Sequence, residues 1–268
     1  MPLHCQDGLN KIRAGKELAL GMGIHHLRGS AAPMLAKAAG FDWLFIDAEH
    51  GFISTGEIAQ ICLAALPHGV VPIVRICSGA IDEGTRALDN GALGLVVPHV
   101  DAPEQARALV EAFRFAPMGH RSTGGTNAQF GYRPPAAAEA QKLLNAGILI
   151  IPMIETPLAV ENAEAIAAIP GIDALLIGTN DLSLEMGISG QIGHARIKAA
   201  YATVAGACRK HGKVLGMGGV YDQELATEYI GMGAQFILGA NDHALLLNAA
   251  TQRAAFLREL PLGDGRKA

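Results

Sequence analysis

The sequence predicts an α/β fold, specifically a (β/α)₈ barrel formed by a single domain. Eight apolar runs of strand length recur along the 268 residues, and alanine-rich stretches with helical spacing lie between most of them. The runs are continuous rather than alternating, which is typical of strands that are buried on both faces. A composition of 50% hydrophobic and 17% charged residues provides enough apolar surface for one large core.

The strands are expected where the apolar runs occur. In chain order these runs are Leu18–Met22, Trp43–Ile46, Val71–Val74, Gly94–Val97, Leu149–Ile154, Ala174–Ile177, Val214–Met217 and Phe236–Leu238. The expected helices are Ala31–Ala39, Thr55–Leu66, Ile81–Asn90, Pro103–Phe113, Val160–Ala168, His194–His211 and Gln223–Met232. Ser54 can cap the second of these helices, because its hydroxyl can accept a backbone hydrogen bond in the first turn.

A doubly wound open sheet is the alternative fold. Its phosphate-binding G-x-G-x-x-G turn after the first strand is missing, because Gly21-Met22-Gly23 is followed by His25-His26. The segment Pro117–Pro135 is rich in glycine, proline and polar residues, so we expect either a mobile loop or an interface segment there. We expect one barrel domain over residues 1–262 and a flexible tail over 263–268.

The bulk properties argue against several classes of protein. A net charge of −4 without a basic run argues against nucleic acid as the main partner. No apolar stretch approaches the roughly 20 residues that span a bilayer, and the first residues do not resemble a signal peptide. The four cysteines are scattered, which suits thiols in a reducing cytoplasm.

Ionisable residues gather where the predicted strands end, which is where (β/α)₈ barrels place their chemistry. Asp47-Ala48-Glu49-His50-Gly51 ends the second strand, Arg75 ends the third, and His25-His26 follow the first. A lone His50 or Arg75 could be only a hydrogen-bond partner. Several at one rim indicate a functional cluster, since unpaired buried charges cost several kcal/mol.

Two carboxylates stand out within this cluster. Glu155 follows the fifth predicted strand, and Asn180-Asp181 follow the sixth. Two carboxylates at the same end of neighbouring parallel strands are suitable oxygen ligands for a hard divalent cation. The sequence therefore predicts a metal site that includes Glu155 and Asp181.

The lysines decide between two mechanisms. A Schiff-base aldolase needs a lysine that projects from a strand into the barrel. Lys16 and Lys213 precede strands, at the wrong end of the barrel, and the other lysines fall in helices or tails. No G-x-S-x-G elbow is present either. Lewis-acid chemistry with a histidine base and an arginine remains.

Several motifs resemble the HpcH/HpaI aldolase family, and they follow the family's order from about Gly21 to Gly239. They are Phe41–Gly51 (FDWLFIDAEHG), Val74-Arg75, Leu88–Ala92 (LDNGA), Val97-Pro98, Ile154-Glu155-Thr156 and Gly178–Ser183 (GTNDLS). The resemblance implies a TIM barrel of the phosphoenolpyruvate/pyruvate type. It also implies a class II aldolase, an aldehyde-lyase that reversibly cleaves a 4-hydroxy-2-oxo acid into pyruvate, or a close 2-oxo acid, and an aldehyde.

The resemblance also implies roles for individual residues. Glu155 and Asp181 would hold Mg²⁺ or Mn²⁺, with Co²⁺ or Zn²⁺ as further candidates, so that a metal-stabilised enolate forms. Arg75 would stabilise the enolate oxygen. His50 would be the base, acting through a water, while Asp89, from the same or another subunit, would raise its basicity. Asp47 would support the site, and the backbone of Gly178, Thr179, Asn180 and Asp181 would bind the substrate carboxylate.

Three departures from the family concern the substrate. Met153 replaces a glutamine that contacts substrate in well-known members, and a methionine cannot donate a hydrogen bond. The family's G-x-R-G-x-G loop is altered to Gly119–Gly125 (GHRSTGG), and His25-His26 replace a more apolar or small-residue stretch. We therefore expect an aldehyde half that differs from that of the best-known degradative members.

Three other functions are weighed against this one. Gly216–Gly219 and Gly239-Ala240-Asn241 could cradle a phosphate in an isomerase or synthase, although tight turns explain the same glycines. An acyl-CoA-type lyase shares the barrel and the carboxylates, and a non-enzymatic binding barrel is the least favoured. The resemblance further implies a homo-oligomer, a hexamer built as a trimer of dimers, in which the apolar helix Ala244–Leu257 would be exchanged or would simply close the fold.

Overall fold

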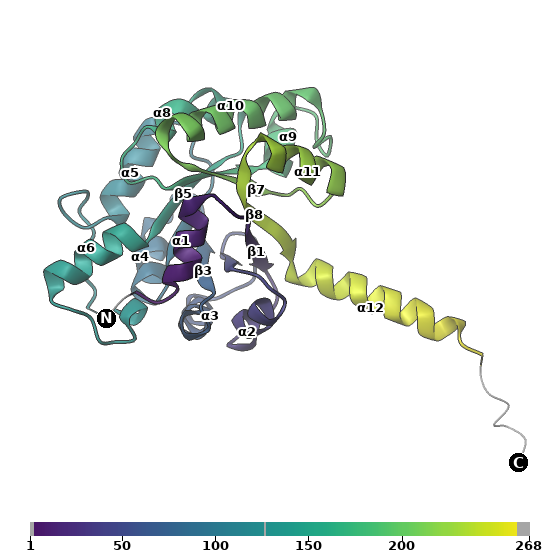
Figure 1. The fold of residues 1–268 in the computed structure, drawn as a ribbon, viewed down its shortest axis with the longest axis horizontal. Coiled ribbons are helices and arrows are strands. Elements are labelled where there is room, and N and C mark those ends of the chain that lie inside the picture. Colours follow the sequence, from purple (N-terminus) through teal and green to yellow (C-terminus); the bar gives the residue numbers. More distant parts are fainter. Residues whose placement is uncertain (1–2, 126, 262–268) are drawn as a thin grey trace, which may run out of the picture.

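The computed structural model describes residues 3–125 and 127–261, and its strands form a closed parallel barrel in sequence order (Figure 1). The predicted (β/α)₈ barrel is therefore confirmed. The strands are β1 (Ala19–Ile24), β2 (Trp43–Asp47), β3 (Val71–Arg75), β4 (Gly94–Val97), β5 (Leu149–Ile154), β6 (Ala174–Gly178), β7 (Val214–Gly218) and β8 (Ala234–Asn241). Strand β8 starts and ends beyond the predicted run, and its extension places Asn241 at the rim of the barrel.

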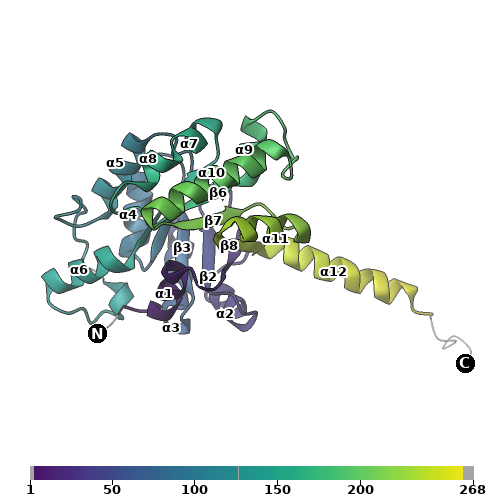
Figure 2. The ribbon, with the colours of Figure 1, turned by 45° about the horizontal axis from the view of Figure 1, so that its top comes forward.

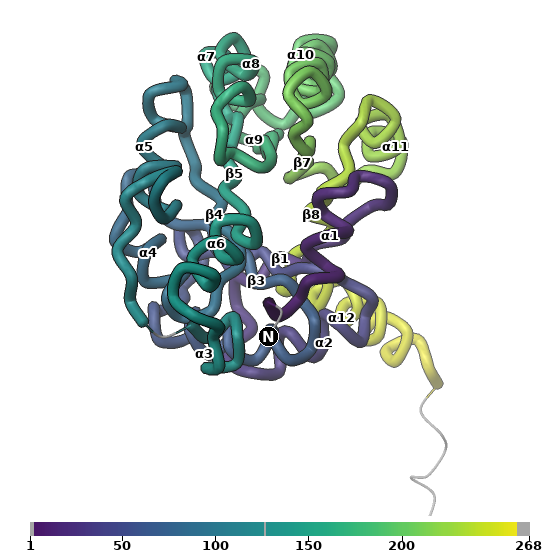
Figure 3. The backbone as a smooth tube through the Cα atoms, turned by 60° about the vertical axis from the view of Figure 1, so that its left-hand side comes forward, coloured from purple at the N-terminus to yellow at the C-terminus, as the bar shows by residue number. Residues whose placement is uncertain are grey.

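Most of the helices surround the strands on the outside of the barrel, whereas the first and the last helix lie elsewhere (Figure 3). They are α1 (Gln6–Ala14), α2 (Ala31–Ala38), α3 (Thr55–His68), α4 (Ile81–Asp89), α5 (Pro103–Phe113), α6 (Ala137–Gly147), α7 (Pro157–Glu161), α8 (Ala163–Ala167), α9 (Thr179–Glu185), α10 (Ala195–His211), α11 (Gln223–Met232) and α12 (Asp242–Glu259). The helix predicted over Val160–Ala168 is in fact two short helices with Asn162 between them. Ser54 caps α3 as expected, because its hydroxyl accepts a hydrogen bond from the Glu57 N–H.

The helix α1 lies across the amino ends of the strands, where the sequence pattern did not predict a helix. Its buried Leu9 and Ile12 face the barrel. Lys11 binds the carboxylate of Asp42 just before β2, at 2.9 Å, and Arg13 donates to the Ile148 carbonyl just before β5, at 3.1 Å. These contacts hold α1 at the end of the barrel opposite the predicted site.

Trp43 of β2 contacts both β1 and β8, the first and last strands, which pair with each other and close the barrel. Its ring is fully buried and stacks on Phe236 of β8, with ring centroids 4.0 Å apart. The indole N–H donates to the carbonyl of Ala19 in β1, at 3.1 Å. A Cβ on Gly21 would overlap the indole, so glycine at this position lets β1 lie directly against the tryptophan.

The segment predicted as a loop or interface, Pro117–Pro135, packs partly within the chain. A short 3₁₀ helix, η1 (Ala128–Phe130), buries Phe130 completely, and Gln129 donates to the carbonyl of Ala92 at 3.1 Å. The tail predicted at 263–268 lies outside the described residues. Within residues 3–125 and 127–261, no helix is long and apolar enough to cross a membrane.

The last helix, α12, projects away from the barrel (Figures 1 and 2). Asp242 in its first turn is its buried residue. Leu246 and Leu247 are 68% and 65% exposed, and Phe256 and Leu257 are about half exposed. An apolar helix face of this kind is normally covered in a stable protein.

Candidate active site at the carboxyl ends of the strands

A cavity of about 290 Å³ lies at the carboxyl ends of the strands. Its lining includes His50, Arg75 and Asp181, which were all predicted for the site. The other residues that line it are His25, Phe45, Met153, Leu176, Gly178, Thr179, Asn180, Gly218, Gly219, Tyr221, Leu238 and Asn241. The structure thus brings side chains that are distant in sequence to one end of the barrel, as the strand pattern predicted.

Asp47 and Arg75 form a bidentate pair at the ends of β2 and β3, which are directly paired in the sheet. Nε of Arg75 donates to Oδ1 of Asp47 at 2.9 Å, and Nη2 donates to Oδ2 at 2.6 Å. Burial would raise the pKa of Asp47, but the hydrogen bonds and charge of Arg75 outweigh it and hold that pKa below its ordinary value. Asp47 therefore remains a carboxylate that fixes the direction of the guanidinium.

The same carboxylate organises the turn after β2. Oδ1 of Asp47 also accepts hydrogen bonds from the backbone N–H groups of Glu49 and His50, each at 3.1 Å. Glu49 lies 3.3 Å from Nη1 of Arg75 and 3.7 Å from Nε2 of His50. The imidazole of His50 is 65% exposed, so in this chain it stands at the mouth of the cavity.

His25 reaches Asp47 from the other side. Its Nδ1 lies 3.1 Å from Oδ2 of Asp47, and its side chain is only 17% exposed. Burial lowers the pKa of His25 by more than the nearby charges of Asp47 and Asp242 raise it. The ring is therefore a neutral imidazole near pH 7, and we assign its hydrogen to Nδ1 because that nitrogen faces the Asp47 carboxylate.

Glu155 occupies the rim just after β5 and is 2% exposed. The N–H of His99 donates to its Oε2 at 3.1 Å, and a Cβ on Gly178 would come within 2.5 Å of its Oε1. Burial is the main cause that raises the pKa of Glu155 to about 7; the charge of Asp181 acts in the same direction, and the hydrogen bond from the His99 N–H acts against it. A positive charge bound beside Glu155 would favour its carboxylate form.

The donor set at Glu155 and Asp181 suits a hard divalent cation. Asp181 lies in the first turn of α9, directly after β6, and β6 pairs with β5 through Met153–Leu176 and Ile154–Ile177. The described part of the chain has no group of three or more His, Cys, Asp and Glu placed to hold a metal ion. Mg²⁺ sites typically have this arrangement, in which the protein supplies one or two carboxylates and the other coordination positions are filled by water and substrate oxygens.

Comparison with known proteins identifies the family. The family model of the HpcH/HpaI aldolase/citrate lyase family matches residues 25–249. This chain belongs to that family. A 4-hydroxy-4-methyl-2-oxoglutarate aldolase from Hapsidospora irregularis is 36% identical over 259 residues, which cover 94% of this chain and 95% of the relative.

Two further similarities agree with this assignment. A hydroxypyruvate/pyruvate aldolase from Cupriavidus necator is 36% identical over 86% of each chain. The crystal structure of an HpcH/HpaI aldolase from Desulfitobacterium hafniense superimposes with a TM-score of 0.88 at 30% identity, and the match covers 94% of this chain and 96% of that one. The chain is therefore a carbon–carbon lyase of the aldolase type.

The position of Asp89 in this lyase limits its predicted role. Asp89 is the last residue of α4, and α4 runs back from the carboxyl end of β3 toward the amino end of β4. Its Oδ1 accepts a hydrogen bond from Nη2 of Arg121 at 2.8 Å. Asp89 thus lies at the opposite end of its own barrel from His50, so a contact between them requires a second subunit.

The glycines of β7 are explained by packing in this lyase. A Cβ on Gly216 would lie 2.7 Å from Leu176 and 3.0 Å from Phe236, inside the closely packed barrel. Gly219 has φ +82° and sits against the amide of Asn180. Thr179 uses its hydroxyl to bind the carbonyl of Gly218 at 2.7 Å. These contacts account for Gly216 by close packing and for Gly219 by a tight turn, the explanation favoured over a phosphate cradle.

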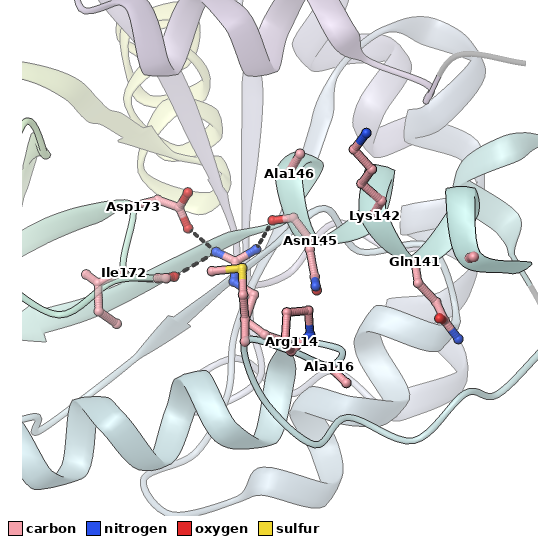
Figure 4. A pocket seen from close by; sticks show the side chains of 12 residues that line it. Arg114, Ala116, Gln141, Lys142, Asn145, Ala146, Ile172 and Asp173 are labelled. Carbon is pink, nitrogen blue, oxygen red and sulfur yellow. Dashed lines mark hydrogen bonds and ion pairs between the residues drawn. The ribbon is translucent and has the colours of Figure 1, made fainter.

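The lyase has a larger cavity, of about 720 Å³, at the opposite end of the barrel (Figure 4). The buried guanidinium of Arg114 donates there to the carbonyls of Asn145 and Gly171, at 2.6 and 2.7 Å, and pairs with Asp173 at 2.5 Å. These bonds satisfy carbonyls where helices end and strands begin. Arg114 is therefore a structural residue, and the size of this cavity does not indicate the active site.

Tyr221 and His99 were not predicted for the lyase site, and Asn241 was named only as part of a possible phosphate cradle. Tyr221 and Asn241 line the cavity, and Nδ2 of Asn241 donates to the Tyr221 hydroxyl at 3.0 Å. His99 adopts a left-handed φ of 54° where it donates to Glu155. All three lie within four residues after a predicted strand, so inspecting every polar residue just beyond a strand end would have found them. Of the described residues that line the cavity, none is a lysine, which agrees with the lysine argument.

Proposed function

We propose that this chain is a metal-dependent class II aldolase that reversibly cleaves a 4-hydroxy-2-oxo acid into pyruvate, or a close 2-oxo acid, and an aldehyde. The observation that carries the proposal is the placement of Glu155, Asp181 and the Asp47-fixed Arg75 at one end of one barrel. Relatives described as aldolases of 4-hydroxy-4-methyl-2-oxoglutarate and of hydroxypyruvate and pyruvate support the same class of substrate.

The proposed mechanism assigns one task to each group. Glu155 and Asp181 hold the divalent cation, which when bound supplies Lewis acidity for the developing negative charge. As the C3–C4 bond breaks, its electron pair moves to the 2-keto oxygen, and Arg75 donates hydrogen bonds to that oxygen. His50 takes the proton of the 4-hydroxyl through a water. His50 then returns this proton through the water to C3, and pyruvate leaves after the aldehyde.

Positioning falls to the backbone and to Asp47. The backbone of residues 178–181 binds the substrate carboxylate in this proposal, because these residues form the turn from β6 into α9 and line the cavity. Asp47 holds both Arg75 and the turn that carries His50. A partner subunit's Asp89 would complete the histidine base, since the Asp89 of the same chain lies at the other end of the barrel.

Removal of the metal tests the function directly. We expect pyruvate release from a panel of 4-hydroxy-2-oxo acids to stop after exhaustive chelation and to return when Mg²⁺ or Mn²⁺ is added back. A coupled assay that reduces pyruvate as it forms measures the rate. Activity that persists without any divalent cation would contradict the proposal, and cation-independent turnover of a phosphorylated sugar would support the phosphate-binding alternative instead.

We also propose that α12 mediates assembly with a second copy of this chain, in dimers that build up the hexamer. An apolar cavity of about 700 Å³ lies between α12 and the barrel, lined by Met22, Leu27, Leu35, Leu245, Leu246 and other residues. The α12 of a second copy carries exposed leucines that can fill this apolar cavity. If each copy places its α12 against the other, the two contacts are equivalent, as a two-fold symmetric dimer requires.

Replacement of Leu246 and Leu247 by glutamate should convert the assembly into monomers, because two charges would be buried without partners. Light scattering during gel filtration measures the mass. Gln252→Glu is the matched control, since helical periodicity places Gln252 on the other side of α12. A double variant that keeps the parent's mass would show that this face does not hold the subunits together.

The location we propose is the cytoplasm. The structure describes Cys5, Cys62, Cys77 and Cys208 as free thiols, and three of them are buried. Burial raises the pKa of Cys5 to about 12, which disfavours its reactive thiolate form. Unpaired and unreactive cysteines suit a reducing compartment.

A further inference from the structure

One wall of the cavity has no task in the proposed mechanism. The metal pair and Arg75 come from β5, β6 and β3, whereas His25, Tyr221 and Asn241 come from the ends of β1, β7 and β8. These three side chains line the same cavity as Arg75 and Asp181. The wall is polar, although the other cavity residues near it, such as Leu238, are apolar.

His25 presents a hydrogen-bond acceptor on this wall. Its Nδ1 is taken by Asp47 at 3.1 Å, and its backbone N–H donates to Asp242 at 3.1 Å. The ring also packs edge-on against His243, with centroids 5.3 Å apart. Nε2 has no hydrogen-bond partner among the described residues, and because the ring is neutral this nitrogen carries a lone pair. The contact with Asp47 accounts for the position of Nδ1, whereas no contact within the described residues accounts for Nε2.

Tyr221 presents a hydrogen-bond donor to the same cavity. Its hydroxyl oxygen accepts a hydrogen bond from Nδ2 of Asn241 at 3.0 Å, so its own O–H remains available to a ligand. Asn241 can take this position because Gly23 has no side chain, since a Cβ there would overlap Oδ1 of Asn241. The phenol is therefore held in place at the mouth of the cavity.

We propose that His25 and Tyr221 form the subsite for the aldehyde half of the substrate and select an aldehyde half that carries a hydroxyl or carbonyl oxygen. The inference rests on the proposed aldolase function, in which the pyruvyl half lies at Glu155, Asp181 and Arg75. A hydroxyl on the aldehyde half can donate to Nε2 of His25 and accept from Tyr221. An alkyl group of the same size leaves both protein groups desolvated and unpaired.

Synthesis from pyruvate with two aldehydes of equal heavy-atom count measures this selection. Glycolaldehyde carries a hydroxyl where propanal carries a methyl group. With Mn²⁺ present, we expect kcat/KM to favour glycolaldehyde by about a hundredfold, roughly tenfold for each hydrogen bond. Tyr221→Phe and His25→Asn should each lower that preference by about tenfold. In His25→Asn the amide Nδ2 can replace Nδ1 and keep the bond to Asp47.

Two controls separate this effect from general damage. His26→Asn changes the neighbouring histidine, whose ring packs on His243 and does not line the cavity, and Tyr132→Phe removes a hydroxyl from an exposed tyrosine. Neither should change the preference. The inference is overturned if the parent enzyme favours propanal, or if Tyr221→Phe and His25→Asn keep the parent's preference while turnover continues.

Exchange of the methyl protons of pyruvate with deuterated solvent, followed by NMR, distinguishes the two levels of failure. This exchange needs the pyruvyl half of the site and no aldehyde. Exchange and turnover without aldehyde selection refute the subsite and leave the proposed function intact. Absence of exchange and of turnover with both aldehydes refutes the proposed function, and the subsite with it.

Discussion

Glu155→Gln should abolish divalent-cation binding and lower the rate of cleavage by about a thousandfold, since a cation contributes several kcal/mol of transition-state stabilisation. Glutamine keeps the shape of the side chain and can still accept from the His99 N–H, which lies 3.1 Å from Oε2. The substitution therefore removes charge at a buried position and little else. Calorimetric titration with Mn²⁺ measures the binding, and pyruvate release measures the rate.

Two controls locate the effect of this substitution. Glu139→Gln alters an exposed carboxylate on α6 and should leave both measurements unchanged. His50→Ala should slow cleavage while Mn²⁺ still binds, because His50 acts on the hydroxyl proton in the proposed mechanism. Normal Mn²⁺ affinity in Glu155→Gln would refute the assignment of Glu155 as a metal ligand.

Asp47→Asn should lower the free energy of unfolding by about 3–5 kcal/mol, the usual cost of leaving one member of a buried ion pair alone. Asp47 is completely buried and accepts two hydrogen bonds from Arg75. An asparagine amide can face Arg75 with only one acceptor oxygen, so the guanidinium loses half of its bidentate contact. Denaturant unfolding followed by circular dichroism measures the change, and Asp7→Asn on the exposed side of α1 should shift it by less than about 0.5 kcal/mol.

The pH dependence of this loss has a definite sign. The pKa of Asp47 is lower in the folded chain than in the unfolded chain, where it is about 3.9. The unfolded chain therefore binds the proton first, and the stabilisation by Asp47 is present above about pH 4 and is lost as the pH falls through the folded pKa. The difference between Asp47→Asn and the parent should shrink below about pH 4. A difference that stays constant down to pH 2 would contradict the ion-pair explanation.

The barrel could be predicted from the sequence because its strands are continuous apolar runs, which few other structures require. Strand ends were then enough to place Asp47, Arg75, Glu155 and Asp181 at one rim. The helix α9 was missed because it is only seven residues long and follows β6 without a linker. The extension of β8 to Asn241 was missed because Gly239-Ala240-Asn241 contains no apolar run.

The electrostatics of the site could be predicted less well than its composition. Nothing in the sequence shows that Asp47 is shared by Arg75, His25 and two backbone N–H groups, because these contacts depend on how the turns after β1 and β2 meet. The partnership of His50 with Asp89 is suggested by the sequence, but the fold of a single chain does not bring the two residues together. The family motif implies it, but the end of α4 lies at the far side of the same barrel, and the sequence does not describe how subunits meet.

The close fit of Gly178 against Glu155 has a consequence for how this site can evolve. A Cβ at residue 178 would come within 2.5 Å of the carboxylate oxygen, so any larger residue displaces the acidic group without altering a single charge. The two positions are therefore inherited as one unit: neither can drift alone while the other keeps its function. A lineage that no longer uses the proposed metal would be released from both constraints at once, and the glycine should then be among the first residues to change.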